Sequence, residues 1–148
     1  MQHRYALIVG IDNYTDTSHF IPLRFAQVDA RALYELLIDP ERGGWNPGEV
    51  TFLAGDAATR EEIESQLRDL CLVRAQAGDL VLFYFAGHAF LDPAARDGYL
   101  ALKTTLADRP ATGLRVPTFV DHYLSASKAS NMLAILDIAH AGTGWRQQ

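Results

Sequence analysis

Two apolar runs of the chain end in residues that could do acid–base or nucleophilic chemistry. The run at 80–86 leads to His88, and the run at 131–136 leads to Asp137 and Ala139. A histidine at the end of a strand can act as a general base, and a carboxylate can hold a cation. Alanine stands where a nucleophile would complete the arrangement. The sequence therefore raises the question of what chemistry these two ends served.

Hydrophobic patterning predicts the elements that position these residues. Four runs are nearly continuous in apolar residues, as strands covered on both faces are, and they span 5–11, 49–55, 80–87 and 131–138. Helical periodicity marks the segments 23–39, 59–73 and 116–127, and residues 99–103 form a candidate short strand. The order β-α-β-α-β-α-β predicts an α/β fold: a mostly parallel sheet, right-handed crossovers and helices on both faces. Ligands of such sheets bind beyond the carboxyl ends of the strands.

Composition sets the broad class of protein. With 148 residues, 49% hydrophobic residues and a net charge of −5, residues 1–148 are expected to form one globular domain. No basic stripe favours nucleic acid, and no apolar run is long enough for a signal peptide or membrane span. Cys71 is the only cysteine, so no intramolecular disulfide can form. These features favour a cytoplasmic location.

Five segments resemble a known family in order and spacing. They read ALIVGIDNY, LRFAQVDARAL, YFAGHA, DGYLAL and ILDIAHAG. In this order they are similar to the large subunit of the caspase-like cysteine peptidases, the group of caspases, metacaspases and their bacterial relatives. The resemblance runs from Tyr5 to Gly142. It implies a caspase-like fold with a flavodoxin-like strand order, of which the chain contains the large-subunit portion.

The resemblance also implies a catalytic machinery. The histidine of the family's Gly-His motif is the general base and corresponds to His88. The cysteine of its Asp-x-Cys-His-Ser-Gly motif is the nucleophile and corresponds to Ala139. The backbone N–H after the histidine, here that of Ala89, contributes to the oxyanion hole. The resemblance implies a cysteine endopeptidase with a His–Cys dyad that acts on peptides or proteins. As written the chain is expected to be inactive, since alanine cannot attack a carbonyl.

Two origins of Ala139 fit the sequence. One is a deliberate Cys-to-Ala exchange, which removes a sulfur atom with little change in volume and traps substrate. The other is a natural pseudoenzyme. Retention of His88, Asp137 and His140 favours the exchange, because a decayed site would be expected to lose more.

Substrate preference is implied by two acidic residues. Metacaspase-like relatives line the pocket for the P1 residue, the one before the cleaved bond, with carboxylates at positions that correspond to Asp29 and Asp137. Two carboxylates in a partly desolvated pocket favour a cation, so Arg or Lys is expected at P1. Asp137 is expected to be buried, as it interrupts an apolar strand. Arg24 supports the alternative of Asp at P1, but it is one position out of the caspase spacing.

Other polar residues give weaker signals. His3, His19 and His122 have no ligand-like spacing, so no metal site is predicted from them. Asp92 and Asp97 are a candidate Ca²⁺ pair, an ordinary solvated loop being the alternative, and no other cofactor is expected. Cys71 is expected to be a packed core thiol.

The family pattern continues past the end of this chain. Relatives carry a small subunit with two more strands, so a small-subunit segment or partner chain is expected to complete the sheet, and Arg146 is a candidate maturation site. Two other functions are open. A catalytically dead scaffold or regulatory domain would keep the fold and bind partners. A phospho-receiver or nucleotide-binding domain is disfavoured, since no P-loop or Gly-x-Gly-x-x-Gly follows a strand. A role in defence or cell death would follow from family analogy alone.

Overall fold

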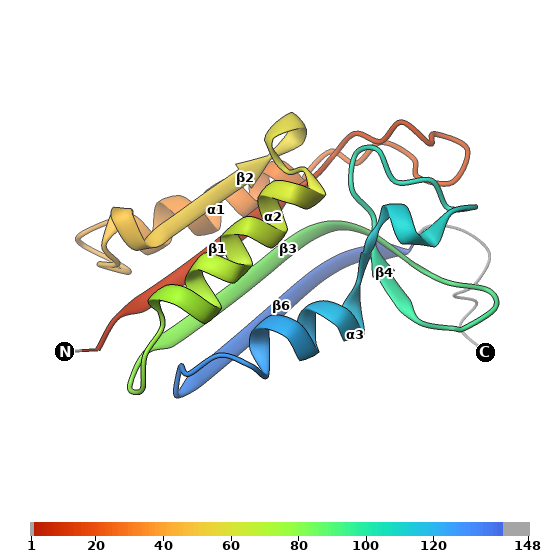
Figure 1. Ribbon diagram of the computed structural model, residues 1–148. Coiled ribbons are helices and arrows are strands. Elements are labelled where there is room, and N and C mark those ends of the chain that lie inside the picture. Colours follow the sequence, from red (N-terminus) through yellow and green to blue (C-terminus); the bar gives the residue numbers. More distant parts are fainter. Residues whose placement is uncertain (1, 141–148) are drawn as a thin grey trace, which may run out of the picture.

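The computed structural model describes residues 2–140 and contains a six-stranded sheet. Its four parallel strands lie in the order β2-β1-β3-β6. Their bounds are Arg4–Gly10 for β1, Val50–Ala54 for β2, Leu80–Leu91 for β3 and Asn131–His140 for β6. Figure 1 shows the four strands side by side, with all their carboxyl ends at one edge of the sheet. The predicted α/β class and parallel sheet are confirmed.

Two short strands extend the sheet beyond the parallel part. β4 (Gly98–Leu100) pairs antiparallel with the last residues of β3, and β5 (Leu114–Arg115) pairs antiparallel with β4. β3 therefore has β1 and β6 as neighbours along most of its length and meets β4 only from Ala89 onward. The short strand expected at 99–103 exists, whereas β5 was not predicted because two residues carry no periodicity.

Helices cover both faces of the sheet, as the sequence predicts (Figure 1). α1 (Ala26–Ile38) packs on one face. α2 (Arg60–Arg68) and α3 (Val116–Phe119) pack on the other, and each continues into a wider, π-helical segment, at Asp69–Arg74 and Val120–Leu124. Thr59 caps the N-terminus of α2, because its side chain accepts a hydrogen bond from the Glu62 N–H at 3.1 Å.

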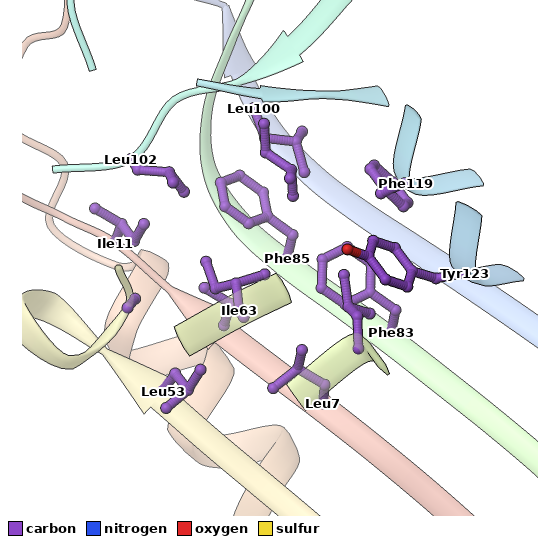
Figure 2. Close-up of a cluster of buried hydrophobic side chains, with 14 of the residues drawn as sticks. Leu7, Ile11, Leu53, Ile63, Phe83, Phe85, Leu100, Leu102, Phe119 and Tyr123 are labelled. Carbon is purple, nitrogen blue, oxygen red and sulfur yellow. The ribbon is translucent and has the colours of Figure 1, made fainter. Parts of the chain in front are cut away.

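The larger hydrophobic core lies between the sheet and the helices α2 and α3 (Figure 2). Figure 2 shows side chains of β1 and β3, among them Leu7, Phe83 and Phe85, beneath Ile63 of α2 and Phe119 of α3. These five side chains are fully buried. Their burial fixes the strands whose ends carry the candidate site. Within residues 2–140, no helix is long and apolar enough to cross a membrane.

β6 departs from the expectation that all four long strands are covered on both faces. On its α1 side, Leu133 is 50% exposed and Ile135 is 42% exposed. α1 lies over β1, β2 and β3, and β6 has β3 as its only strand neighbour among the described residues. The apolar sequence of β6 predicts burial on both faces, and this prediction is wrong for the α1 side.

Candidate active site

His88 and position 139 are direct neighbours across two strands. In the parallel pairing of β3 with β6, His88 is in register with Ala139. Residues in register on adjacent strands lie about 4.8 Å apart and point to the same face of a sheet. A cysteine side chain at position 139 would therefore reach the imidazole of His88. The spacing is that of a His–Cys dyad.

The imidazole of His88 is buried and has both nitrogen atoms near backbone carbonyl oxygens. Nε2 lies 2.7 Å from the carbonyl oxygen of Ile21, and Nδ1 lies 3.3 Å from that of Ala139. A neutral imidazole carries one N–H, and the shorter contact favours the tautomer in which Nε2–H donates to Ile21. Nδ1 then carries no proton and lies on the side of position 139, beside its backbone oxygen.

One loop holds His88 in place. This loop, residues 12–24, joins β1 to α1 and carries Tyr14, Phe20 and Ile21, all of which contact His88. Its tip is tied to a neighbouring loop, because Thr15 N–H donates to the carbonyl oxygen of Lys103 at 2.8 Å. Sequence reasoning missed Ile21 and Tyr14. Ile21 acts through its backbone carbonyl, which every residue type has, so the sequence cannot identify it. A single tyrosine after a strand does not by itself indicate a contact with the histidine.

The two predicted specificity residues share one pocket that reaches position 139 but is not lined by His88 itself. Asp29 from α1 and Asp137 from β6 line a cavity of about 210 Å³, whose wall also includes Ala139 and Phe25. Ala86 and Gly87, the residues before His88, form part of the same wall. The structure therefore brings Asp29, Asp137 and position 139 together at the carboxyl ends of the strands.

Tyr84 of β3 lies close to both carboxylates of this pocket. Tyr84 of β3 donates a hydrogen bond from its hydroxyl to Oδ2 of Asp137 at 3.4 Å. Burial first, and then the charges of Asp137 and Asp29, raise the pKa of Tyr84 to about 12. The negative charges of both carboxylates therefore act on the same phenol. Such a field favours a cationic ligand.

Two details of the pocket differ from expectation. Asp137 is exposed, so its expected burial was wrong: it lies on the uncovered α1 side of β6, where water solvates the carboxylate. Arg24 lies in the pocket wall as well. Among the described residues no ion pair joins Arg24 to Asp29 or Asp137. The pocket therefore offers one cation as well as two anions.

The remaining candidates lie away from the pocket. Ala89 is in register with both His140 and Leu100, so its N–H lies inside the sheet, and its oxyanion role stays a prediction. Asp97 holds Arg115 through a 2.8 Å ion pair, and the Ca²⁺ pair that it would form with Asp92 also stays a prediction.

Two further expectations concern Cys71 and the C-terminal region. The Cys71 side chain is fully buried, as expected for a core thiol. Gly142 and Arg146 lie outside the described residues, and so does the expected maturation site.

Comparisons with known proteins assign the chain to a family. The family model described as "Caspase domain" matches residues 3–146. The chain belongs to the caspase-domain family, peptidase family C14. No curated protein matches the sequence.

Among solved structures, the crystal structure of protein GSU0716 from Geobacter sulfurreducens is similar, with a TM-score of 0.67 and 22% identity. The alignment covers 95% of this chain and 52% of that one, so the chain spans about half the length of its structural relative. At this identity the likeness shows the fold.

Proposed function

We propose that this domain is the large-subunit part of a cysteine endopeptidase that cleaves after Arg or Lys, present here in a nucleophile-less form. One observation carries the proposal: Asp29 and Asp137 line a pocket that also contains position 139, next to the buried imidazole of His88. With Ala139 in place, the domain would bind a basic peptide without cutting it. Its single, buried cysteine suits a reducing compartment, the cytoplasm.

In the active form, His88 would take the proton of the nucleophile. Its Nε2–H donates to Ile21, so Nδ1 is the nitrogen that accepts a proton from a thiol at position 139. The imidazolium that forms is stabilised by the Ile21 carbonyl, which replaces the carboxylate of a triad. The thiolate would attack the peptide carbonyl, and His88 would return the proton to the leaving amine.

A second protein segment would complete the cleft. Among the described residues, β6 is the edge strand of the parallel part of the sheet, and Leu133 and Ile135 are exposed on its α1 face. An unpaired edge favours addition of a further strand, and an exposed apolar face favours a covering element. A small-subunit segment, from downstream in the same gene or from a partner chain, would supply both.

A scaffold without catalysis is the second candidate, and Ala139 is the observation that favours it. The two candidates differ in the codon for position 139 in the native gene. A cysteine codon supports the peptidase. An alanine codon supports a domain that uses the pocket for binding alone.

Peptide binding and cleavage test the proposal. The unaltered chain is titrated with peptides that differ only at P1, carrying Arg, Lys, norleucine or Asp, with binding measured by calorimetry. We expect Arg and Lys peptides to bind best, and Asp137→Asn to weaken them on the order of fivefold, because the pair is solvent-exposed. Asp121→Asn, an exposed acid on the opposite side of the sheet, is the matched control. Added salt should weaken binding of the basic peptides alone.

Cleavage is then measured for Ala139→Cys, with any downstream sequence that the gene encodes, as kcat/KM on the same peptides. Hydrolysis after Arg or Lys that is abolished by His88→Ala supports the proposal. Preference for Asp at P1 would overturn the pocket assignment and favour Arg24. A folded, complete protein that cleaves nothing would leave the scaffold as the better account.

A further inference from the structure

Tyr14 contacts the Gly87–His88 peptide, and the proposed function gives this residue no task of its own. It follows β1 in the loop 12–24, and its side chain is 5% exposed. The backbone N–H of His88 donates a hydrogen bond to the Tyr14 hydroxyl oxygen at 2.8 Å, across 74 positions of sequence. The two rings meet edge to face with their centres 5.0 Å apart. Tyr14 thus contacts both the backbone and the side chain of the candidate general base.

The direction of each hydrogen bond at Tyr14 is fixed. Because its oxygen accepts from His88, its own proton is available for one donation, and the carbonyl oxygen of Ile11 lies 3.0 Å away. Burial raises the pKa of Tyr14 above its ordinary value, so the phenol stays protonated and keeps both bonds at neutral pH. The hydroxyl therefore connects the carbonyl oxygen of Ile11, just after β1, to the backbone N–H of His88 in β3.

Gly87 is fitted to this hydroxyl. A Cβ placed on Gly87 would lie 2.7 Å from the Tyr14 oxygen, which is too close for a carbon–oxygen contact. No positive φ is required at Gly87, so the absence of a side chain here serves the approach of the phenol. The glycine before the histidine and the tyrosine of the loop form one packing unit.

The same loop holds the other end of the imidazole. Ile21 accepts from Nε2 of His88, and the ring of Phe20 lies 5.7 Å from that of His88. A shift of the His88 backbone would change the distance from Nε2 to Ile21 and the direction in which Nδ1 points. The backbone of His88 has its N–H held by Tyr14 and its carbonyl oxygen held by the N–H of Ala101 at 2.9 Å. Tyr14 also packs edge to face against the ring.

We propose that Tyr14 is a positioning residue: its hydroxyl fixes the backbone of His88 so that Nε2–H stays on Ile21 and the unprotonated Nδ1 faces position 139. Its meaning for catalysis rests on the proposed peptidase function, whereas its effect on the imidazole does not. Tyr14 acts through His88 and touches no reacting atom.

The test compares Tyr14→Phe with the unaltered chain by nitrogen NMR of ¹⁵N-labelled histidine, in which ring signals report the tautomer. His88→Gln identifies the His88 signals among those of five histidines. In the unaltered chain we expect His88 to be a single Nε2–H tautomer. In Tyr14→Phe we expect a second tautomer or broadened ring signals. Tyr123→Phe is the matched control, since Tyr123 is buried in the core to a similar extent, at 7% exposure (Figure 2). Its ring neighbours that of His122, so this variant should leave the His88 ring signals unchanged.

Gly87→Ala provides a second route, because its added methyl displaces the phenol while keeping the hydroxyl. It should give the same mixing of tautomers, so whichever of the two variants folds decides the question. A folded variant with the spectrum of the unaltered chain would overturn the proposal. So would an Nδ1–H tautomer in the unaltered chain.

A kinetic measurement separates this proposal from the peptidase function. In the Ala139→Cys protein, Tyr14→Phe should lower kcat on the order of tenfold to a hundredfold and change KM less than about twofold, since misplacement of a catalytic group affects the chemical step. An equal loss in Tyr123→Phe would mean a general effect on stability and would overturn the positioning role. If the Ala139→Cys parent is inactive, the peptidase function fails and the NMR comparison still decides the role of Tyr14.

Discussion

Gly10, the last residue of β1, lies tightly against α1. A Cβ at Gly10 would lie 2.7 Å from Cβ of Ala30, 2.8 Å from the carbonyl oxygen of Ala26 and 2.9 Å from Cα of Gln27. Carbon atoms in contact prefer separations of at least about 3.5 Å, so Gly10→Ala forces the helix to retreat by roughly 0.8 Å. Two of the three atoms belong to backbone, so no rotation of a side chain relieves the clash.

We expect Gly10→Ala to lower the free energy of unfolding by about 1–3 kcal/mol, the usual cost of overpacking. For a domain of this size the melting temperature falls about 2–4 °C per kcal/mol, so a decrease of about 2–12 °C is expected. Gly98→Ala is the control, because its Cβ would meet nothing closer than Cγ2 of Val116 at 3.8 Å.

Thermal unfolding followed by circular dichroism measures both variants. The same retreat moves Asp29, one turn into α1, so binding of the basic peptides should weaken in Gly10→Ala and not in Gly98→Ala. Equal melting temperatures for the two variants would refute the argument that the glycine permits close packing of α1.

Two further predictions concern groups outside the pocket. Cys71 should resist a thiol reagent until denaturant is added, because burial raises its pKa to about 11 and little thiolate is present; rapid, stoichiometric labelling in native buffer would contradict this. Asp79 accepts backbone hydrogen bonds from His3 and Gln76, which lower its pKa in the folded state. Its stabilisation is therefore complete above the pKa of the unfolded carboxyl and is lost as pH falls through the folded value. Urea unfolding of the unaltered chain and of Asp79→Asn, from neutral pH to about pH 2, should show a stability difference that vanishes in acid, and a constant difference would contradict it.

The parts of the site that could be predicted from sequence follow from one rule of parallel sheets. Strand ends gather at one edge, so the residues after two neighbouring strands must meet. His88 and Ala139 obey this rule, since continuous apolar runs mark β3 and β6 and the polar residues come where those runs end. Asp29 could be predicted as a pocket residue only from the family resemblance, because an acid in the first turn of a helix is already explained by its favourable interaction with the helix dipole.

The backbone path of the loop 12–24 could not be predicted from the sequence. The contacts of Ile21 and Tyr14 with His88 depend on the path of a loop with no periodicity. The burial of Asp137 was misjudged for a different reason. An apolar run indicates that side chains avoid water, but it does not identify the element that covers them, and α1 does not reach β6 at Leu133 and Ile135.

One continuous piece of chain contacts His88 and lines the pocket. Ile21 holds Nε2 of His88, and Leu23, Arg24 and Phe25, which follow it, line the wall of the pocket up to the start of α1. The segment is anchored after Ile21 as well, since Leu23 N–H donates to the carbonyl oxygen of Asp12 at 2.8 Å. The path of this one segment therefore sets both the position of the Ile21 carbonyl beside His88 and the shape of the pocket wall.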